Sequence, residues 1–331
     1  MGQYKVVITD YEYASLAEEE REIAAIGADL VPTQCKTEEE LIATCKDADG
    51  LLNQYAELTR NVIEKLDRCK VIARYGVGVN TIDLEAATEK GICVVNVPDY
   101  CMDEVSDHAF ALLLSCARKV TLLNQAVKHD VWDYKVGKPI PRLRGQKLGL
   151  LGFGRIPRAL AEKAKAFGFE LLVYDPYVKQ EDVAAYDGTL MTLEDILKAA
   201  DFISVHVPLN HDTHHLIGEK EFKLMKPNAV IINTSRGPLI DEQALIHALE
   251  SKMIAGAGLD VLEQEPVAKD NPLLTMEQVI LTPHVAWYSE HSELELKAKA
   301  ARGVADVLSG YYPASLVNQA VKSRLQLKER V

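Results

Sequence analysis

The chain has 331 residues, of which 48% are hydrophobic, and a formal net charge of −12. A chain of this length and composition can bury large cores and is expected to form about two domains. The acidic balance argues against nucleic acid as a direct ligand, because a phosphate backbone normally binds a basic face. No apolar run approaches the roughly 18 residues that a membrane span needs, and the sequence begins directly with a strand pattern. We therefore expect no membrane partner, no signal peptide and a cytoplasmic location.

Neither the cysteines nor the histidines have the spacing of a typical metal site. The six cysteines form no C-x-x-C pair, which favours free thiols in a reducing compartment. His211, His214 and His215 lie close together in HDTHH, but Asp212 is the only acid near them in the sequence. This pattern favours a solvated or locally bonded loop over a metal site, and we expect no metal.

The first hundred residues alternate strand and helix patterns, which is typical of an α/β layer. Strand patterns occur at 5–9, 29–31, 50–53, 71–73 and 92–95, and helical patterns at 15–26, 38–45, 59–66 and 84–89. The fourth strand runs into the turn RYGVGVN, which contains two glycines. A glycine turn at the carboxyl end of a strand can offer free backbone N–H groups to a carboxylate, so we favour a substrate loop over a structural turn.

A long apolar pattern follows at 103–128 and predicts a single helix that is apolar over most of its circumference. So wide an apolar face suggests packing between domains or subunits, and we expect a homodimer built on this helix. The segment VWDYKVGKPIPRLRG then leads into the next strand.

The stretch from Lys147 to Asp175 predicts half of a nucleotide site. An apolar strand precedes Gly152-Phe153-Gly154, an amphipathic helix follows, and a second strand ends at Asp175. The glycines allow a sharp turn, and the unpaired N–H groups at the helix start can hold a pyrophosphate. Asp175 stands about 20 residues after the first glycine, where a dinucleotide fold places the acid that binds the adenosine ribose. An acid there repels a 2′-phosphate, so NAD is favoured over NADP; the alternative is an ordinary strand–helix turn.

Pro157 replaces the third glycine of the dinucleotide fingerprint. Proline has no N–H and cannot lie as close to the strand as glycine, but it is tolerated in the first helical turn. We therefore expect a locally shifted helix start and an intact site.

The second half of the chain continues a parallel sheet. Strands are expected at 202–205, 230–233, 257–260 and 279–281, separated by helices at 193–199, 219–225 and 242–249. Thr192, followed by Asp195 three residues later, has the pattern of a capping box. A final helix at 289–308 is expected to return the chain to the first domain. The predicted fold class is α/β with two domains: a flavodoxin-like substrate domain, 1–100 plus 290–331, and a Rossmann-type doubly wound NAD-binding domain, 101–289.

Three polar residues, Arg236, Glu265 and His284, stand at or just beyond predicted strand ends in the second half. An arginine can hold a carboxylate with two donors, and a histidine can exchange a proton near neutral pH. A neighbouring glutamate can orient the imidazole and favour its charged form. Each residue alone could equally be structural, but together with NAD they suggest hydride transfer to or from a 2-hydroxy acid.

At these residues the sequence resembles the D-isomer-specific 2-hydroxyacid dehydrogenase family, and the resemblance covers nearly the whole chain. The motifs occur in the family's order: RYGVGVNTID, VPDYCMDEVSDHAFALLL, LGFGRI, HVPLNHDTHHLI, VIINTSRGPLIDEQAL, GLDVLEQEP and TPHVAWYS. The resemblance implies that Arg236 holds the substrate carboxylate and C2 oxygen, that His284 is the acid/base, and that Glu265 is its partner. Pro157 departs from the pattern, as does Asn80, where many members have aspartate.

The resemblance also implies binding residues. For NAD, the expected set is Gly152, Gly154, Arg155, Ile156, Asp175, His206, Pro208, Thr234, Asp260 and His284. For the substrate, it is Tyr55, Arg74, Val77, Gly78, Arg236 and Trp287, with Val77 and Gly78 offering backbone N–H groups to the carboxylate.

The segment after the catalytic histidine looks most like the C-terminal binding protein branch, in which a tryptophan such as Trp287 lines the substrate pocket. That branch includes transcription corepressors, so an NAD(H)-sensing binding protein is the alternative to an enzyme. The substrate itself stays open. A small or apolar 2-keto acid is preferred, with 3-phosphoglycerate, hydroxypyruvate or glyoxylate as alternatives, because the loop NQYAELTR has few of the basic residues that a phosphate would need.

Overall fold

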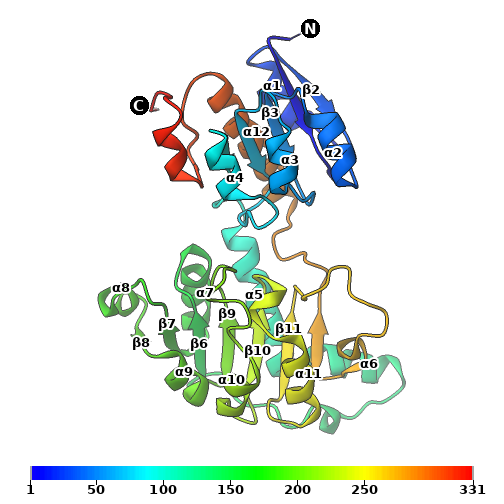
Figure 1. Ribbon diagram of the computed structural model, residues 1–331. Coiled ribbons are helices and arrows are strands. Elements are labelled where there is room, and N and C mark those ends of the chain that lie inside the picture. Colours follow the sequence, from blue (N-terminus) through cyan, green and yellow to red (C-terminus); the bar gives the residue numbers. More distant parts are fainter. Residues whose placement is uncertain (1, 330–331) are drawn as a thin grey trace. The chain divides into compact units, whose positions relative to one another are not determined.

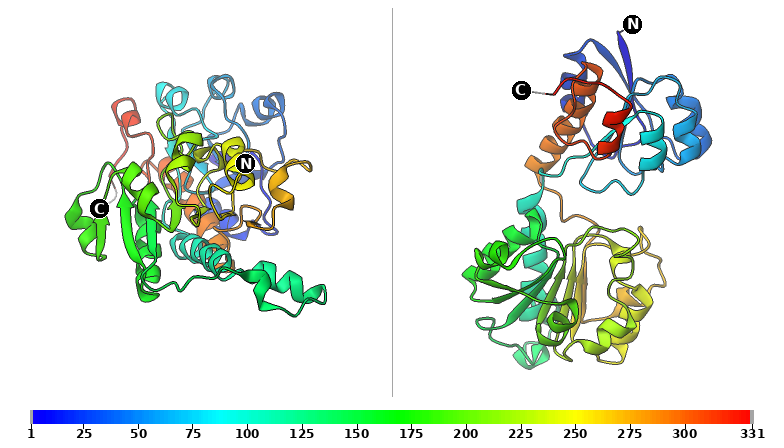
Figure 2. Two further views of the ribbon diagram at one scale, coloured as in Figure 1. Left: turned by 90° about the horizontal axis from the view of Figure 1, so that it is seen from below. Right: turned by 60° about the vertical axis from the view of Figure 1, so that its left-hand side comes forward.

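In the computed structural model of the protein, which describes residues 2–329, the chain divides into two compact units. Unit 1 combines Met1–Cys101 with Ser289–Val331, and unit 2 is Met102–Tyr288. In each unit, helices cover both faces of one parallel sheet (Figures 1 and 2). The α/β fold class predicted from the sequence is confirmed.

Unit 1 contains a five-stranded parallel sheet with the order β2-β1-β3-β4-β5, which is the flavodoxin-like order. The strands are β1 (Tyr4–Ile8), β2 (Ala28–Pro32), β3 (Gly50–Asn53), β4 (Val71–Arg74) and β5 (Cys93–Val95). The helices are α1 (Ala17–Ala24), α2 (Glu38–Cys45), α3 (Arg60–Glu64), α4 (Leu84–Glu89) and α12 (Glu290–Leu308). Helices α2, α3 and α4 contribute to one hydrophobic cluster, while α12 packs on α1 and on the central strands.

Two polar side chains attach the C-terminal part of the chain to the rest of unit 1. Lys297 of α12 is 1% exposed, and its Nζ lies 2.8 Å from Glu18 Oε2 of α1. Asn318 accepts a hydrogen bond from Val94 N at 2.8 Å and donates to Ile92 O at 2.9 Å, at the edge strand. Because a buried charge or amide is costly without its partner, these bonds specify where the returning segment packs.

Unit 2 contains a seven-stranded parallel sheet with the order β12-β11-β10-β9-β6-β7-β8. The strands are β6 (Lys147–Leu151), β7 (Glu170–Tyr174), β8 (Gly188–Leu190), β9 (Phe202–Val205), β10 (Val230–Asn233), β11 (Gly256–Leu259) and β12 (Val279–Leu281). The six strands β6 to β11 have the doubly wound Rossmann order, in which the direction of winding reverses between β6 and β9. Ligands of such sheets bind beyond the carboxyl ends of the strands at this reversal.

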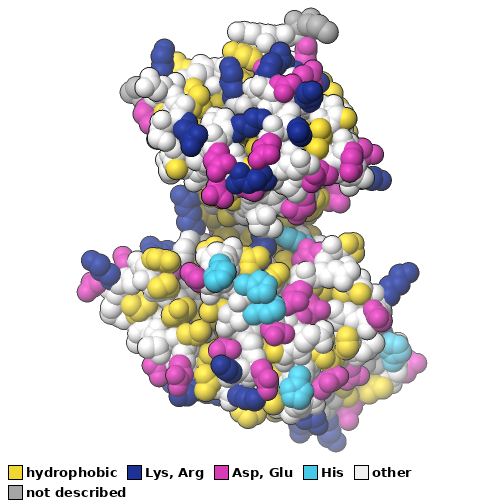
Figure 3. Space-filling view, viewed as in Figure 1, with side chains coloured by type: hydrophobic (Ala, Val, Ile, Leu, Met, Phe, Trp, Pro, Cys, Tyr) yellow, Lys and Arg dark blue, Asp and Glu magenta, His cyan; other side chains and the backbone are white. Residues whose placement is uncertain are grey.

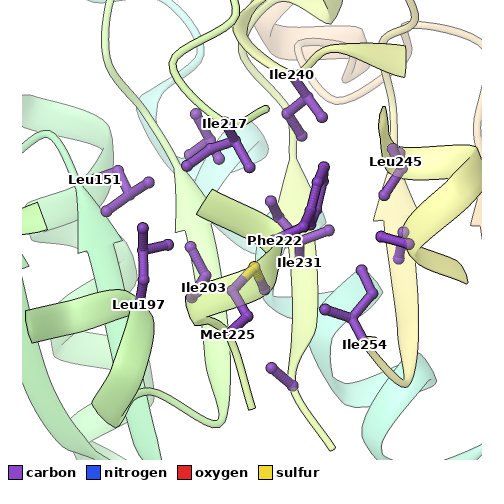
Figure 4. Packing of buried hydrophobic residues seen from close by; sticks show 14 of the residues in the cluster. Leu151, Leu197, Ile203, Ile217, Phe222, Met225, Ile231, Ile240, Leu245 and Ile254 are labelled. Atoms are coloured by element: carbon purple, nitrogen blue, oxygen red, sulfur yellow. The ribbon is translucent and has the colours of Figure 1, made fainter. Parts of the chain in front are cut away.

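The helices of unit 2 cover the sheet on both faces. They are α5 (Met102–Arg118), α6 (Val120–Lys128), α7 (Arg155–Ala166), α8 (Gln180–Ala184), α9 (Leu193–Ala199), α10 (Glu219–Leu224) and α11 (Glu242–Glu250). Helices α5 and α7 share one hydrophobic cluster, whereas α9, α10 and α11 contribute to another. The second cluster contains Phe222 of α10 together with Ile203 of β9 and Ile231 of β10 (Figure 4).

Two sequence expectations for unit 2 need correction. The single helix expected over 103–128 is wrong, because Lys119 has a φ of 55° and the left-handed backbone there separates α5 from α6. Helix α5 buries most of its apolar face, but α6 has no fully buried residue. The pair α8 and β8 lies between β7 and α9, where the sequence predicts no element; β8 has only three residues, too few to show a period.

The N-cap predicted at Thr192 is confirmed, although the Asp195 carboxylate accepts a hydrogen bond from the Thr192 hydroxyl rather than from its backbone N–H as in a full capping box. Thr192 Oγ1 accepts a hydrogen bond from Asp195 N at 3.2 Å, as a serine or threonine N-cap is expected to do. None of the helices in residues 2–329 combines the length and apolarity needed to cross a membrane.

Candidate functional site

The glycine turn after β6 requires glycine at position 152, and Gly154 leaves the start of α7 without a side-chain cap. Gly152 has a φ of 96°, and a Cβ there would lie 3.0 Å from the backbone of His206 and Val207. Gly154 is the N-cap of α7, has no side chain to cap the helix, and has nothing within 4 Å of an added Cβ. The start of α7 therefore has no side-chain cap, which leaves its first N–H groups available to a bound diphosphate.

Helix α7 begins at Arg155, directly after the turn, so the shifted start expected from Pro157 is not observed. Pro157 is buried as the third helical residue, a position where its missing N–H leaves no hydrogen bond unmade. Arg155 is exposed and Ile156 half-buried beside it.

Asp175 holds the glycine turn through a hydrogen bond to its backbone. Its Oδ2 accepts a hydrogen bond from Phe153 N and its Oδ1 one from Tyr177 N, both at 2.8 Å. Each carboxylate oxygen has a second lone pair, so the acid keeps the capacity to accept from two ribose hydroxyls.

At the ends of β9 and β10 the side chains expected to contact NAD differ in their bonding. His206 Nε2 lies 2.8 Å from Ser204 Oγ, and burial lowers the pKa of this imidazole to about 4, so it is neutral at pH 7. Pro208 is exposed in the loop that follows. Thr234 Oγ1 is buried without a hydrogen-bond partner. A buried hydroxyl without a partner in a folded protein indicates a ligand or water that it binds.

Asp260, at the end of β11, organises the segment that carries His284. This carboxylate is 2% exposed and accepts hydrogen bonds from Thr282 Oγ1 at 2.5 Å, Val285 N at 3.0 Å and Ala286 N at 2.8 Å. The backbone N–H of His284 also donates to Asp260 O at 2.8 Å. The position of His284 is therefore set by one buried acid.

His284 and Glu265 form a pair. His284 Nδ1 lies 2.6 Å from Glu265 Oε2, and Glu265 Oε1 accepts a hydrogen bond from Leu262 N at 3.0 Å. Burial acts to raise the pKa of Glu265, but the hydrogen bond and charge of His284, with smaller contributions from Leu262 N–H and Arg236, leave that pKa below its usual value. Glu265 is thus an ionised acceptor that occupies Nδ1, and Nε2 is the imidazole nitrogen left to exchange a proton.

Arg236 enters this group from the turn after β10. Its Nη1 donates to Ser235 O at 2.6 Å, and Asn233 Nδ2 donates to Arg236 O at 2.8 Å. Gly237 follows in close contact with the Glu265 turn, since an added Cβ would lie 1.9 Å from the Leu262 carbonyl. The structure therefore brings the Arg236 turn, Glu265 and His284 together at one sheet edge.

Comparison with known proteins shows which family of proteins has this sequence pattern. The family model described as "D-isomer specific 2-hydroxyacid dehydrogenase, NAD binding domain" matches residues 110–286. The chain belongs to the D-isomer-specific 2-hydroxyacid dehydrogenase family. It is an NAD-dependent oxidoreductase acting on the CH–OH group of 2-hydroxy acids, which confirms the enzyme class and cofactor expected from the sequence.

Three relatives show how far the similarity extends. D-3-phosphoglycerate dehydrogenase of Methanocaldococcus jannaschii is 44% identical over 85% of this chain, and the match spans 54% of that protein, about half its length. Glyoxylate reductase of Thermococcus litoralis is 40% identical over 85% of this chain and 87% of the relative. The crystal structure of D-lactate dehydrogenase from Aquifex aeolicus, complexed with NAD and lactic acid, has a TM-score of 0.83 and 30% identity, and covers 92% of this chain and 96% of its own. These relatives do not confirm the closer resemblance to the C-terminal binding protein branch.

The dehydrogenase's other expected substrate residues lie in separate parts of the chain. In unit 1, Tyr55 follows β3, while Arg74 ends β4 and is followed by Val77 and Gly78. Arg74 Nε is buried without a hydrogen-bond partner, and burial lowers the pKa of its guanidinium. In unit 2, Trp287 is half-buried and packs edge-on against Tyr288, with ring centroids 5.5 Å apart.

Two residues that contribute to the site of this dehydrogenase are missing from the sequence analysis. His108 Nε2 of α5 lies 2.9 Å from Thr282 Oγ1 and 3.5 Å from Asp260 Oδ1. It stands within a predicted apolar helix face, where an ionisable residue is unusual. That unusual position could have marked His108 as a candidate site residue. Gly237 had the signal of a glycine directly after a candidate site residue.

Replacing Asp175 with asparagine should narrow the preference of the enzyme for NADH over NADPH by about tenfold or more, because the repulsion of a 2′-phosphate is lost. The amide oxygen can still accept from Phe153 N, so NADH should bind with only modest loss. Asp175→Ala is the comparison, since it also removes the acceptor and should weaken both cofactors. Kd values from quenching of protein fluorescence would decide; equal affinity of the native enzyme for both cofactors would contradict the assignment.

Proposed function

We propose that this dehydrogenase reduces a small 2-keto acid to the D-2-hydroxy acid, with Arg236, Glu265 and His284 as its catalytic residues. The observation that carries the proposal is the 2.6 Å contact between His284 Nδ1 and Glu265 Oε2 next to the Arg236 turn. A paired histidine and glutamate beside an arginine supplies a proton donor and a carboxylate-binding cation, the two functions that this reaction needs from the protein.

The residues after β6, β7 and β10 fit the nicotinamide cofactor. The uncapped start of α7 suits a diphosphate, and the Asp175 carboxylate can still accept hydrogen bonds from a ribose. The buried Thr234 Oγ1, which has no hydrogen-bond partner, suits a further polar group of the cofactor. When bound, the reduced cofactor supplies the hydride that reaches C2 of the keto acid. We propose that unit 2 binds the cofactor, and that unit 1 is the substrate domain with Tyr55, Arg74, Val77 and Gly78 as contacts.

In the reducing direction the protein's own groups act on charge and proton. Arg236 holds the substrate carboxylate and polarises the C2 carbonyl, which draws electron density from C2. Glu265 keeps the imidazole of His284 oriented through Nδ1 and stabilises its protonated form. His284 Nε2 then donates its proton to the C2 oxygen as that oxygen gains negative charge. In the oxidising direction the neutral imidazole takes the proton from the C2 hydroxyl.

The identity of the acid is proposed from the relatives. Glyoxylate reductase and D-3-phosphoglycerate dehydrogenase, both similar to this chain, suggest glyoxylate for reduction and 3-phosphoglycerate for oxidation. Hydroxypyruvate, an alternative from the sequence, and pyruvate are the acids to compare with them. We favour a small unphosphorylated acid. The only basic side chain that the segment NQYAELTR after β3 could offer to a phosphate is that of Arg60, which pairs with Glu85 and Glu89. A cytoplasmic location stays a prediction from the sequence.

Turnover of a panel of 2-keto acids by native enzyme and by His284→Ala tests the function. The native enzyme should oxidise NADH with at least one acid of the panel, and the variant should lose about 10²- to 10⁴-fold in kcat, the usual effect of removing a general acid. NADH binding, measured separately, should be nearly unchanged. A variant that keeps most of its turnover on the best acid would show that His284 is not the proton donor.

In a plot of the keto-acid reduction rate against pH, substitution of Glu265 by glutamine should move the alkaline fall in rate to lower pH. The native carboxylate favours the imidazolium, and the amide keeps the shape but not the charge. Because the pKa of Glu265 lies below its usual value, its carboxylate stays charged over the neutral range and loses that charge only as the pH falls through the lowered pKa. An alkaline limb at the same pH in both enzymes would exclude Glu265 as the charge partner.

We also propose a homodimer, built on α6 and the segment after it rather than on α5. This segment exposes Trp132 (89%), Tyr134 (70%) and Val120 (54%), an apolar surface that is unusual for a free helix and loop. Trp132→Ser should therefore weaken association in sedimentation velocity at micromolar concentration. A native protein that sediments only as a monomer under these conditions would contradict the proposal.

A further inference from the structure

A histidine and two carboxylates from distant parts of unit 2 meet outside the site described above. His215, Asp241 and Glu263 place one possible ligand atom each within 4.8 Å of one another. His215 Nε2 lies 2.7 Å from Glu263 Oε1, and its Nδ1 lies 3.8 Å from Asp241 Oδ2. Asp212 is the only acid near this histidine in the sequence, so the HDTHH pattern by itself predicts a solvated or locally bonded loop.

The three side chains are held by their own backbone surroundings. His215 N donates to Pro238 O at 2.8 Å, and its ring lies against that of His214, with centroids 4.0 Å apart. Asp241 caps α11 with Oδ1, which accepts from Ala244 N, so Oδ2 is the oxygen that faces His215. Because these side chains are already held in place, they lose little conformational entropy when a ligand binds, and this favours binding.

Glu263 is held in the same way. Its Oε1 accepts a hydrogen bond from Glu242 N at 3.1 Å, and its own N–H donates to Glu242 Oε2 at 3.1 Å. This arrangement places a third carboxylate, that of Glu242, beside the group. Asp241 and Glu263 pair with His215, and Glu242 accepts a hydrogen bond from Asn271 Nδ2. The local charge is therefore negative even when the imidazole is protonated.

We propose that His215, Asp241 and Glu263 form a binding site for a divalent transition-metal cation of the Zn²⁺ type. One imidazole and two carboxylates are a ligand set that suits first-row transition cations, with solvent completing the coordination. The side chains of His215, Asp241 and Glu263 are 37%, 36% and 33% exposed, so an ion can enter and keep bound water. Ligand bonds of about 2.1 Å put two ligand atoms of a tetrahedral site roughly 3.4 Å apart. The 2.7 Å contact of His215 Nε2 with Glu263 Oε1 therefore has to open, while the wider spacings, up to 4.8 Å, have to close, and half-exposed carboxylates can make both adjustments.

The location suggests what such a cation does. Glu263 lies two residues before Glu265, and the two share the turn in which Leu262 N donates to Glu265 Oε1. Figure 3 shows histidine side chains gathered beside acidic ones on one face of unit 2. A cation bound to Glu263 would join this turn to the segment after β9 and to the start of α11. The site is distinct from the catalytic group and does not depend on the proposed substrate.

Calorimetric titration of Zn²⁺ into untagged, chelator-treated enzyme tests the proposal. The native chain should bind one Zn²⁺, and His215→Gln and Glu263→Gln should each weaken binding by about tenfold or more, the scale on which metal sites respond to lost partners. His211→Gln is the matched control, because that histidine is fully exposed in the same loop and should leave binding unchanged. Mg²⁺ should bind far more weakly, since it prefers oxygen ligands and a nearly ideal octahedron.

Co²⁺ distinguishes this site from the six free cysteines. Bound cobalt should give weak visible bands without a thiolate charge-transfer band, because the proposed ligands are nitrogen and oxygen. A thiolate band, equal Zn²⁺ affinity in His215→Gln and the native chain, or binding weaker than about 1 mM would each overturn the proposal. Should His215→Gln fail to fold, Glu263→Gln provides the same comparison.

Discussion

The arrangement of the catalytic group depends on the buried carboxylate of Asp260. It lies at the end of β11, is almost completely shielded from water, and accepts three hydrogen bonds from the segment that follows β12. A buried carboxylate is stable only when its oxygens are satisfied, so the segment has little freedom to take another path. His284 is in the middle of that segment and has a φ of 54°, a backbone conformation that a histidine keeps only when its surroundings impose it.

Close approach of turns completes the group. Gly237 lets the turn that carries Arg236 lie against the Leu262 carbonyl, and Leu262 in turn donates its N–H to Glu265. The same segment presents Glu263 to His215 on its other side. One short turn after β11 therefore takes part in the pairing of the catalytic histidine and in a second cluster of polar groups.

Strand order explains why these segments meet. In a parallel sheet of the order β12-β11-β10-β9-β6-β7-β8, the carboxyl ends of β6, β9, β10, β11 and β12 face the same edge. The glycine turn, His206, Thr234, Asp260 and His284 all follow these ends, although 132 residues of sequence separate the first from the last. Sites of this kind need no long-range motif, since each strand brings its own following residues to the edge.

The sequence by itself determined the α/β class, the strand–glycine–helix unit around Gly152, the cap at Thr192 and the family, because these depend on local periodicity, turn chemistry or contiguous motifs. Arg236, Glu265 and His284 could be selected because they stand directly after predicted strands. Other features needed the tertiary structure. Nothing local marks the left-handed break at Lys119, and the three-residue strand β8 is too short to have a period. The meeting of His215 with Asp241 and Glu263, and the bonds of His108 and Asp260 to the His284 segment, depend on which strand ends become neighbours, and only folding decides that.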